Sequence, residues 1–295
     1  MQTIPMKKVS IYLKLFVTFL FFLGLTMFVH GEGKTDLADK ILTVTSFVFG
    51  VILAFAISNR NSRLSSIKEK LREQDAKLLE IYYLSKGFNK ELAEDIKKRI
   101  DEFLIIQLDY KLEDYNLKVP EKTRQFFMFL EKLKLKGKED KIRQDILGII
   151  KEIIEINSEV AYQIENKMAF YEWLSLEALA FIIFFVLIFY FNTNDAVSII
   201  IISVVCTALC LLMFVLSDLN KLEWQEENWI WNPLSSLFVE LDLIPYFPAD
   251  VFDSRRLSFQ QVKKWAKVSK IRIAHYPHLY PDMRGKTIEI IKLKD

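Results

Sequence analysis

The chain has 295 residues, of which 52% are hydrophobic and 26% are charged. These two fractions together do not fit one evenly mixed soluble domain, and they predict apolar membrane-crossing segments that alternate with highly charged ones. The formal net charge is only +2, so no global positive field favours a nucleic-acid partner.

Residues 1–58 predict a transmembrane hairpin with spans at 11–29 and 41–58. Each apolar segment is close to the ~20 residues that cross a bilayer, and backbone groups in lipid must be paired internally, which favours helices. A secretory signal peptide is the alternative for the first segment, because Lys7 and Lys8 precede it. However, that segment is long for a signal peptide and lacks a small-x-small cleavage site at its end.

Residues 59–168 predict a helical insert. Apolar residues continue after the second span in three- and four-residue steps, at Leu64, Ile67, Leu71, Leu78 and Ile81, with Gln74 interrupting the series. This stripe predicts that the second span continues as a helix beyond the lipid. Further stripes at 92–103, after Pro120 and at 142–160 predict a bundle of about four antiparallel helices. The last helix can run directly into the third span.

Residues 169–216 predict a second hairpin, with spans at 169–191 and 196–216. Glu172 and Glu177 lie in the first third of the span at 169–191. Carboxylates near apolar surface are costly and tend to face protein or water. They either reach the membrane interface or a neighbouring helix, or they are vestibule charges that influence ions.

The basic residues indicate the direction of the spans. Lysine and arginine precede the first span, follow the second, precede the third and follow the fourth, whereas the loop at 31–39 has three acidic residues and one lysine. The loop at 192–195 has no basic residue. The positive-inside rule therefore predicts a multi-pass protein of the cell membrane, inner or plasma, with both termini and the insert in the cytoplasm.

Residues 217–295 predict a cytoplasmic C-terminal region of mixed structure. Its patterns predict a helix at 234–243, an extended stretch at 244–248, a helix capped by Ser258, and strands at 270–276 and 287–293. The fold class expected for the whole chain is all-α: a four-helix transmembrane protein with a cytoplasmic helical bundle and a small mixed C-terminal tail.

Two features of this region suggest contact with lipid. Trp224, Trp229 and Trp231 follow the fourth span, where aromatic side chains often lie at the membrane interface. The tail from Arg255 onward is basic, which favours either binding to anionic headgroups or a solvated surface.

The sequence carries no catalytic constellation. The motifs of phosphate-binding loops, dinucleotide sites, serine hydrolases and zinc proteases are absent. His275 and His278 flank a proline, with no further histidine or cysteine nearby to complete a metal site. Cys206 and Cys210 lie on one face of an apolar helix, where they are poorly placed to form a disulfide and fit as buried apolar side chains. We expect neither an enzyme nor a cofactor or metal.

The second span carries two adjacent stripes at four-residue steps. The small residues are Ser46, Gly50, Ala54 and Ser58, and the neighbouring stripe is Thr43, Phe47 and Val51. Small residues permit close packing between helices. The other stripe fits a pore lining, in which Phe47 and Val51 form hydrophobic rings that gate by dewetting in an oligomer. The two interpretations are compatible if one face packs and the other lines the pore.

The stretch Ser46–Phe55 resembles the pore-helix signature of bestrophins, in which a Ser-Phe-Val-Leu-Gly-Phe stretch precedes a segment that contains arginine. The order of parts is also similar: two spans, a long cytosolic helical insert, two spans and a tail. The bacterial bestrophin-like domain family, of unknown function, is more similar still, at Glu73–Tyr83, Asp218–Asn220 and Pro245–Pro248. The resemblance covers 41–84 and 170–250.

The resemblance implies a pentameric channel that passes mainly anions, with Phe47 in one neck ring, Val51 in the next and Thr43 outermost. In this sequence Val51 replaces an aromatic residue and Thr43 an aliphatic one. Asn61 follows Arg60 where the family has tryptophans, and no acidic cluster resembles the calcium clasp.

The leading hypothesis is therefore a homo-oligomeric, bestrophin-like channel in a lipid bilayer that passes small ions, with anions favoured. The alternative is a non-conducting membrane scaffold or signalling protein that uses its cytoplasmic helical bundle.

Overall fold

The computed structural model describes residues 11–29, 31–33, 35–110, 112–193, 195–222, 230–254, 257–278 and 282–293. The chain divides into two compact units. Of the described residues, 11–64 and 167–222 form the apolar unit, and 65–166 and 230–293 form the polar unit.

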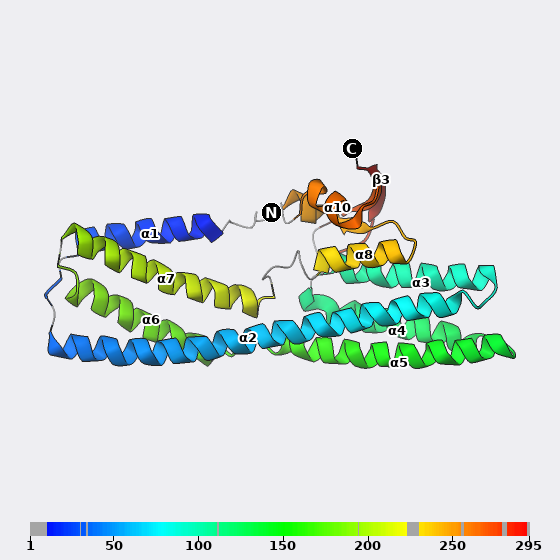
Figure 1. Ribbon diagram of the computed structural model, residues 1–295, viewed down its shortest axis with the longest axis horizontal. Helices are drawn as coiled ribbons and strands as arrows, with labels where there is room; N and C mark the ends of the chain where they lie inside the picture. Colours follow the sequence, from blue (N-terminus) through cyan, green and yellow to red (C-terminus); the bar gives the residue numbers. More distant parts are fainter. Residues whose placement is uncertain are drawn as a thin grey trace. The chain divides into compact units, whose positions relative to one another are not determined.

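Four helices build the apolar unit: α1 (Ile11–Phe28), the first part of α2 (Asp36–Ser85), α6 (Phe170–Tyr190) and α7 (Ala196–Asn220) (Figure 1). Each contains a stretch that is long and apolar enough to cross a membrane, and within the described ranges these four meet that criterion. The expected four-helix transmembrane class is confirmed. Helix α2 runs unbroken for 50 residues from one unit into the other, as the stripe after the second span predicted.

Two buried clusters hold the helices of the apolar unit together. One joins α2, α6 and α7 through Phe49, Leu53, Leu176, Ala180, Ile183 and Leu216. The other joins α1, α6 and α7 through Phe22, Ile188, Ile202 and Cys206. Cys206 is fully buried, as expected of an apolar side chain, and Cys210 is half-buried; neither forms a disulfide.

A buried polar group joins the end of α1 to the loop between α6 and α7. The side-chain amide of Asn192 donates to the backbone oxygens of Thr26 at 2.7 Å and Val29 at 2.8 Å. The Thr26 and Ser203 hydroxyls are 3.1 Å apart, which adds a hydrogen bond between α1 and α7. Buried polar groups are costly unless they are hydrogen-bonded, so these contacts specify one arrangement of the loops. We call Thr26, Asn192 and Ser203 the polar latch.

The latch predicts an asymmetric effect of glycine substitutions. A Cβ added at Gly31 would lie 2.2 Å from the backbone oxygen of Asn192, whereas a Cβ at Gly24 meets nothing within 4 Å. Gly31→Ala should therefore cost about 1–3 kcal/mol through overpacking. Gly24→Ala should be neutral or slightly stabilising, because alanine favours a helix. Thermal unfolding in detergent measures both, and equal stability of the two variants would contradict the latch.

The polar unit begins with a helical bundle. Its members are the second part of α2, α3 (Lys90–Asp109), the short 3₁₀ helix η1 (Leu112–Asp114), α4 (Tyr115–Lys132) and α5 (Lys138–Glu165). Gln74 of α2 bonds to both Gln107 of α3 and Asn157 of α5, and Asn157 donates to Thr123 of α4. The residue that interrupts the apolar stripe therefore belongs to a polar layer that crosses all four helices.

Two boundaries of the bundle differ from those predicted. Helix α4 begins at Tyr115 and contains Pro120 instead of starting there. Helix α5 ends at Glu165 and does not continue into α6. In the apolar unit, the backbone N–H of Met168 donates to the Asn220 side chain, and that of Ala169 donates to Glu172. Side chains thus satisfy N–H groups that a continuous helix would have bonded internally.

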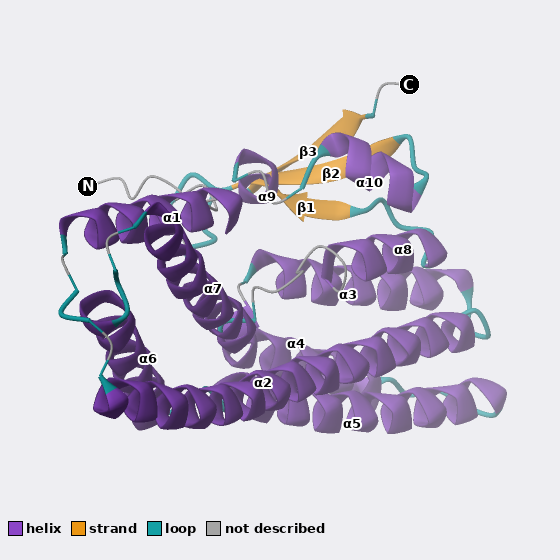
Figure 2. Cartoon of the chain, turned by 60° about the vertical axis from the view of Figure 1, so that its left-hand side comes forward, coloured by secondary structure: helices purple, strands orange, loops and turns teal. Residues whose placement is uncertain are grey.

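The remaining elements of the polar unit form a small sheet with helices. They are α8 (Asn232–Glu240), β1 (Tyr246–Pro248), α9 (Ala249–Asp253), α10 (Phe259–Ala266), β2 (Lys270–His275) and β3 (Thr287–Lys292). The strand order is β1-β2-β3, with β1 parallel and β3 antiparallel to β2 (Figure 2). The alternation in the sequence predicted β2 and β3, and Ser258 caps α10 as expected.

A buried carboxylate fixes the sheet to α3. Asp109 accepts hydrogen bonds from the hydroxyls of Tyr246 and Tyr276, and its other oxygen is 2.7 Å from the ammonium of Lys286. Burial, with Asp109 next in importance, raises the pKa of both tyrosines, so they remain protonated donors. Both carboxylate oxygens of Asp109 therefore have hydrogen-bonding partners.

The position of Trp231 differs from the expectation. Its side chain is buried, and its ring centroid lies 6.1 Å from that of Phe247, so it is a core residue and its expected place at the membrane interface is wrong. Trp224 and Trp229 lie outside the described residues.

Candidate functional site

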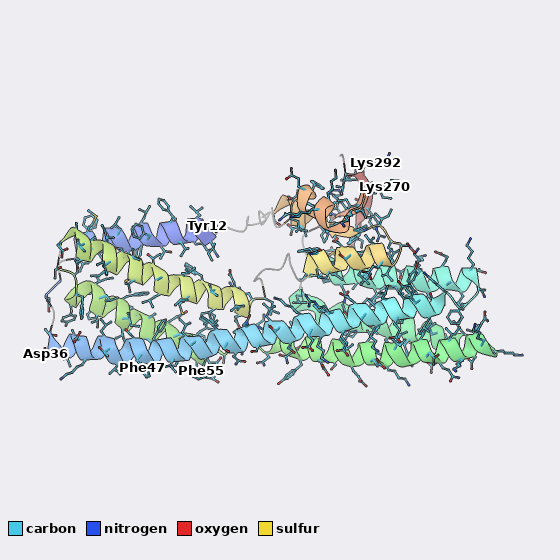
Figure 3. The ribbon with its side chains drawn as sticks, viewed as in Figure 1. Tyr12, Asp36, Phe47, Phe55, Lys270 and Lys292 are labelled. Carbon is cyan, nitrogen blue, oxygen red and sulfur yellow. The ribbon has the colours of Figure 1, made fainter. Side chains whose placement is uncertain are left out.

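Helix α2 presents two opposite faces in the apolar unit. Phe49 and Leu53 pack inward and are only 2% and 3% exposed. Residues two positions apart are about 200° apart around a helix. Phe47 and Val51 therefore lie nearly opposite, and they are 71% and 39% exposed. Figure 3 shows Phe47 and Phe55 on the outer side of the helix.

All seven residues that the sequence singled out on this helix are exposed: Thr43, Ser46, Phe47, Gly50, Val51, Ala54 and Ser58. A Cβ added at Gly50 meets nothing within 4 Å, so the small stripe does not pack against another described helix of this chain at that point. The hydroxyl of Thr43 donates to the backbone oxygen of Asp39 at 2.8 Å. The pore-lining and packing roles of this face stay predictions, and the face is available to lipid or another chain.

The two acidic candidates of α6 have different environments. Glu172 lies in the first turn, where its carboxylate accepts the 2.8 Å hydrogen bond from Ala169, so it caps the helix. Glu177 is exposed, and Leu174 and Phe181, three residues before and four after, are exposed on the same face. A carboxylate on such a face of a membrane-crossing helix indicates protein or water beside it instead of lipid.

Two buried arginines mark the end of the apolar part of α2. Arg60 and Arg63 are both buried, and Arg63 donates to the backbone oxygen of Asn220 at 2.9 Å. Asn220 ends α7, where cations are favoured by the helix dipole. The same residue accepts the hydrogen bond from Met168, so the Asp218–Asn220 segment joins α2, α7 and the start of α6.

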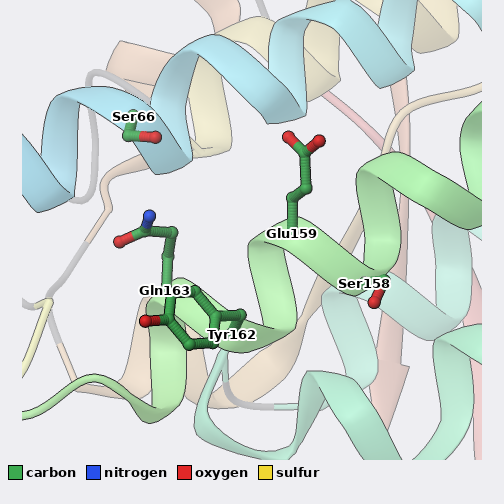
Figure 4. Close-up of a pocket in the computed structure, with 5 residues that line it drawn as sticks. All are labelled: Ser66, Ser158, Glu159, Tyr162 and Gln163. Carbon is green, nitrogen blue, oxygen red and sulfur yellow. The ribbon is translucent and has the colours of Figure 1, made fainter.

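Two hollows in the described part of the polar unit have acidic residues in their linings. The larger is about 400 Å³ and lies between α2 and α5 (Figure 4). It is lined by Ser66, Ser158, Glu159, Tyr162 and Gln163. Glu159 is paired with Lys70 at 2.8 Å, so its charge is already compensated.

The second hollow is about 250 Å³ and lies between α2 and α8. Asp75 and Glu240 line it, with four apolar or small residues and a serine, but without a basic residue. Burial raises the pKa of Asp75 to about 7, although Arg72 acts in the opposite direction. The sequence pattern did not single out Asp75, because a charged residue next to a heptad stripe is ordinarily solvated.

Four apolar helices, with exposed apolar outer faces, define an integral membrane protein. The profile of the bestrophin-like domain family matches residues 12–221, which is most of the chain and includes every helix of the apolar unit. The chain belongs to the bestrophin-like family. No curated protein and no solved structure gives a significant match.

Asp75 predicts a pH dependence of the contact between α2 and α8. Its pKa in the folded protein, about 7, is above the ordinary 3.8, so folding favours the protonated form. The contribution of protonated Asp75 to the stability of the folded state is therefore complete below pH 3.8. It is lost as the pH rises through about 7. Asp75→Asn should slow hydrogen exchange in α8 above pH 7 and flatten its pH dependence. Glu240→Gln is the matched control, and an equal effect of both would contradict this assignment.

Proposed function

We propose that the chain assembles into a homo-oligomeric channel, a pentamer, that passes small ions, with anions favoured. The observation that supports this most is the exposed outer face of α2. A pore-lining helix must be covered by its own chain on one side and open to the axis on the other. Phe49 and Leu53 supply the covered side, and Phe47 and Val51 supply the open side.

The chemistry of that face supports a hydrophobic gate. In a ring of identical helices, Phe47 and Val51 would each form an apolar constriction, which conducts when it is wetted and closes when it dries. Thr43, one turn before Phe47, would add a ring of hydroxyls at the outer end. We place both termini and the polar unit in the cytoplasm, as the distribution of basic residues favours.

The position of Glu177 supports contact with water or a neighbouring subunit. Because a carboxylate in lipid is costly, the exposed face of α6 around Glu177 would line a vestibule or meet another copy. Glu172 is less suited to that role, since its carboxylate already caps its own helix.

Reconstitution in planar bilayers tests conduction. Wild-type protein should carry current, and Phe47→Ala should change the open probability or unit conductance, because it removes the bulk that closes the constriction. Phe21→Ala is the matched control, since Phe21 is 62% exposed but lies on α1. Absence of wild-type current, or equal currents in the two variants, would count decisively against a pore along α2.

The mass of the protein in detergent tests assembly. Gly50→Leu should leave the fold of the chain intact, because a Cβ added there meets nothing within 4 Å and the position is exposed. The larger side chain should prevent close packing of α2 between copies. Gly24→Leu on α1 has equally free space and serves as the control. A shift from pentamer to smaller species is expected for Gly50→Leu alone. A wild-type monomer or dimer would instead favour the scaffold.

A further inference from the structure

Strand β3 has an open edge. The backbone N–H of Leu293 donates to the oxygen of Ser269 at 2.9 Å, and this fixes which residues of β3 face β2. In an antiparallel ladder the facing residues alternate, so Ile288, Ile290 and Lys292 direct their N–H and C=O groups away from β2. Among the described residues, none bonds to these outward groups. Figure 2 shows β3 at the edge of the sheet farther from α3 and α8.

The side chains of this edge include an exposed apolar pair. Ile288 is 46% and Ile290 is 56% exposed. Ile290 is paired with Arg272 in the ladder, so both isoleucines share the sheet face that carries Arg272. Arg272 binds Asp101 of α3 at 2.6 and 2.7 Å. The face is therefore covered by α3 near Arg272 and is left uncovered along β3.

A pair of like charges lies at one end of the same strip. Lys270 and Lys292 are direct partners in the ladder, and both are exposed (Figure 3). Like charges directly opposite each other destabilise a sheet, and no described acidic residue forms an ion pair with either. An acidic group next to Lys292 would relieve this repulsion.

We propose that β3 binds an extended peptide segment of a partner protein, which adds a fourth strand to the sheet. The outward N–H and C=O groups provide main-chain recognition, and the side chains provide specificity. The segment would carry two apolar residues and one acidic residue at alternate positions, next to Ile288, Ile290 and Lys292 in turn. We call this strip, with Lys270, the edge site.

A second copy of the chain fits the edge site poorly when the apolar pairs of the two copies are aligned. A symmetric antiparallel pairing that aligns Ile288 with Ile290 would place Glu289 opposite its own copy and Lys286 opposite Lys292. Both pairs are like-charged and would destabilise the ladder. The other edge of the sheet, β1, has only three residues and ends in Pro248, so it is a short partner for head-to-tail pairing.

The edge site lies outside the part of the chain that defines the family. The family match ends at residue 221, and the sheet is built from residues 246–292. The proposal therefore stands whether or not the apolar unit conducts ions, and it assigns the C-terminal sheet a role in recognition.

Fluorescence anisotropy of a labelled peptide tests the edge site on the full chain in detergent. The probe contains two valines and a glutamate, each alternating with threonine; a second probe has lysine in place of the glutamate. Wild-type protein should bind the first probe at least about tenfold more tightly than the second. Lys292→Glu should reverse this preference, because it changes the charge next to the acidic position.

Ile290→Pro tests the main-chain contacts. The proline removes an N–H that points outward, so the ladder with β2 is kept, and edge strands tolerate proline at such a position. Binding should fall at least about tenfold, while hydrogen exchange of β2 is unchanged. Ile154→Thr, at an exposed isoleucine of α5, should bind as the wild type does.

Three outcomes would overturn the proposal: absence of wild-type binding, equal affinity for both probes, or a change in oligomer mass caused by Ile290→Pro. The last outcome would identify a second copy as the occupant. If Ile290→Pro disturbs the sheet, the reversed preference of Lys292→Glu decides the question.

Discussion

The central constraint on this molecule is that α2 has apolar side chains all around its membrane part, while its own chain covers only one side. Phe49 and Leu53 are buried against α6 and α7, whereas Phe47 and Phe55 are largely exposed. Lipid offers no hydrophobic driving force between helices, so what meets the outer side is decided by packing and polar contacts. The proposed function follows from this unequal coverage.

Polar contacts at the two ends of the apolar unit join its helices to one another. At one end Asn192 bonds to the end of α1, and at the other Arg63 bonds to the end of α7. Both use side chains to satisfy backbone oxygens that a helix end leaves without partners. In a low-dielectric setting such bonds are stronger, and their loss is more costly. They hold α1, α6 and α7 as a support on which one face of α2 rests.

Local patterns predicted the elements, and long-range contacts decided the details. The length and composition of the apolar segments were enough for the four spans, and period-two alternation was enough for β2 and β3. The gap between α5 and α6 depends on Asn220, which is 52 residues from the Met168 that it binds. Asp109 and its partners are separated by 137 to 177 residues, so no local signal could find them. Trp231 was misplaced because an aromatic residue after a span suits an interface and a core equally.

The sequence predicted which residues of the candidate site share a stripe, because the four-residue steps of α2 fix this. It did not predict which stripe faces the rest of the chain. The stripe that suggested helix packing is exposed, and the larger Phe49 and Leu53 make the contacts within the chain. Around the helix axis, the covered side is followed by Ser46 and Gly50 and then by Phe47 and Val51. A helix in a closed ring needs that order. Its outer side packs against its own subunit, its flank meets a neighbouring subunit, and its inner side faces the axis of the ring. Small residues at the flank let backbones approach closely. This angular order, more than the presence of any single residue, favours a ring of α2 helices over a helix that faces only lipid.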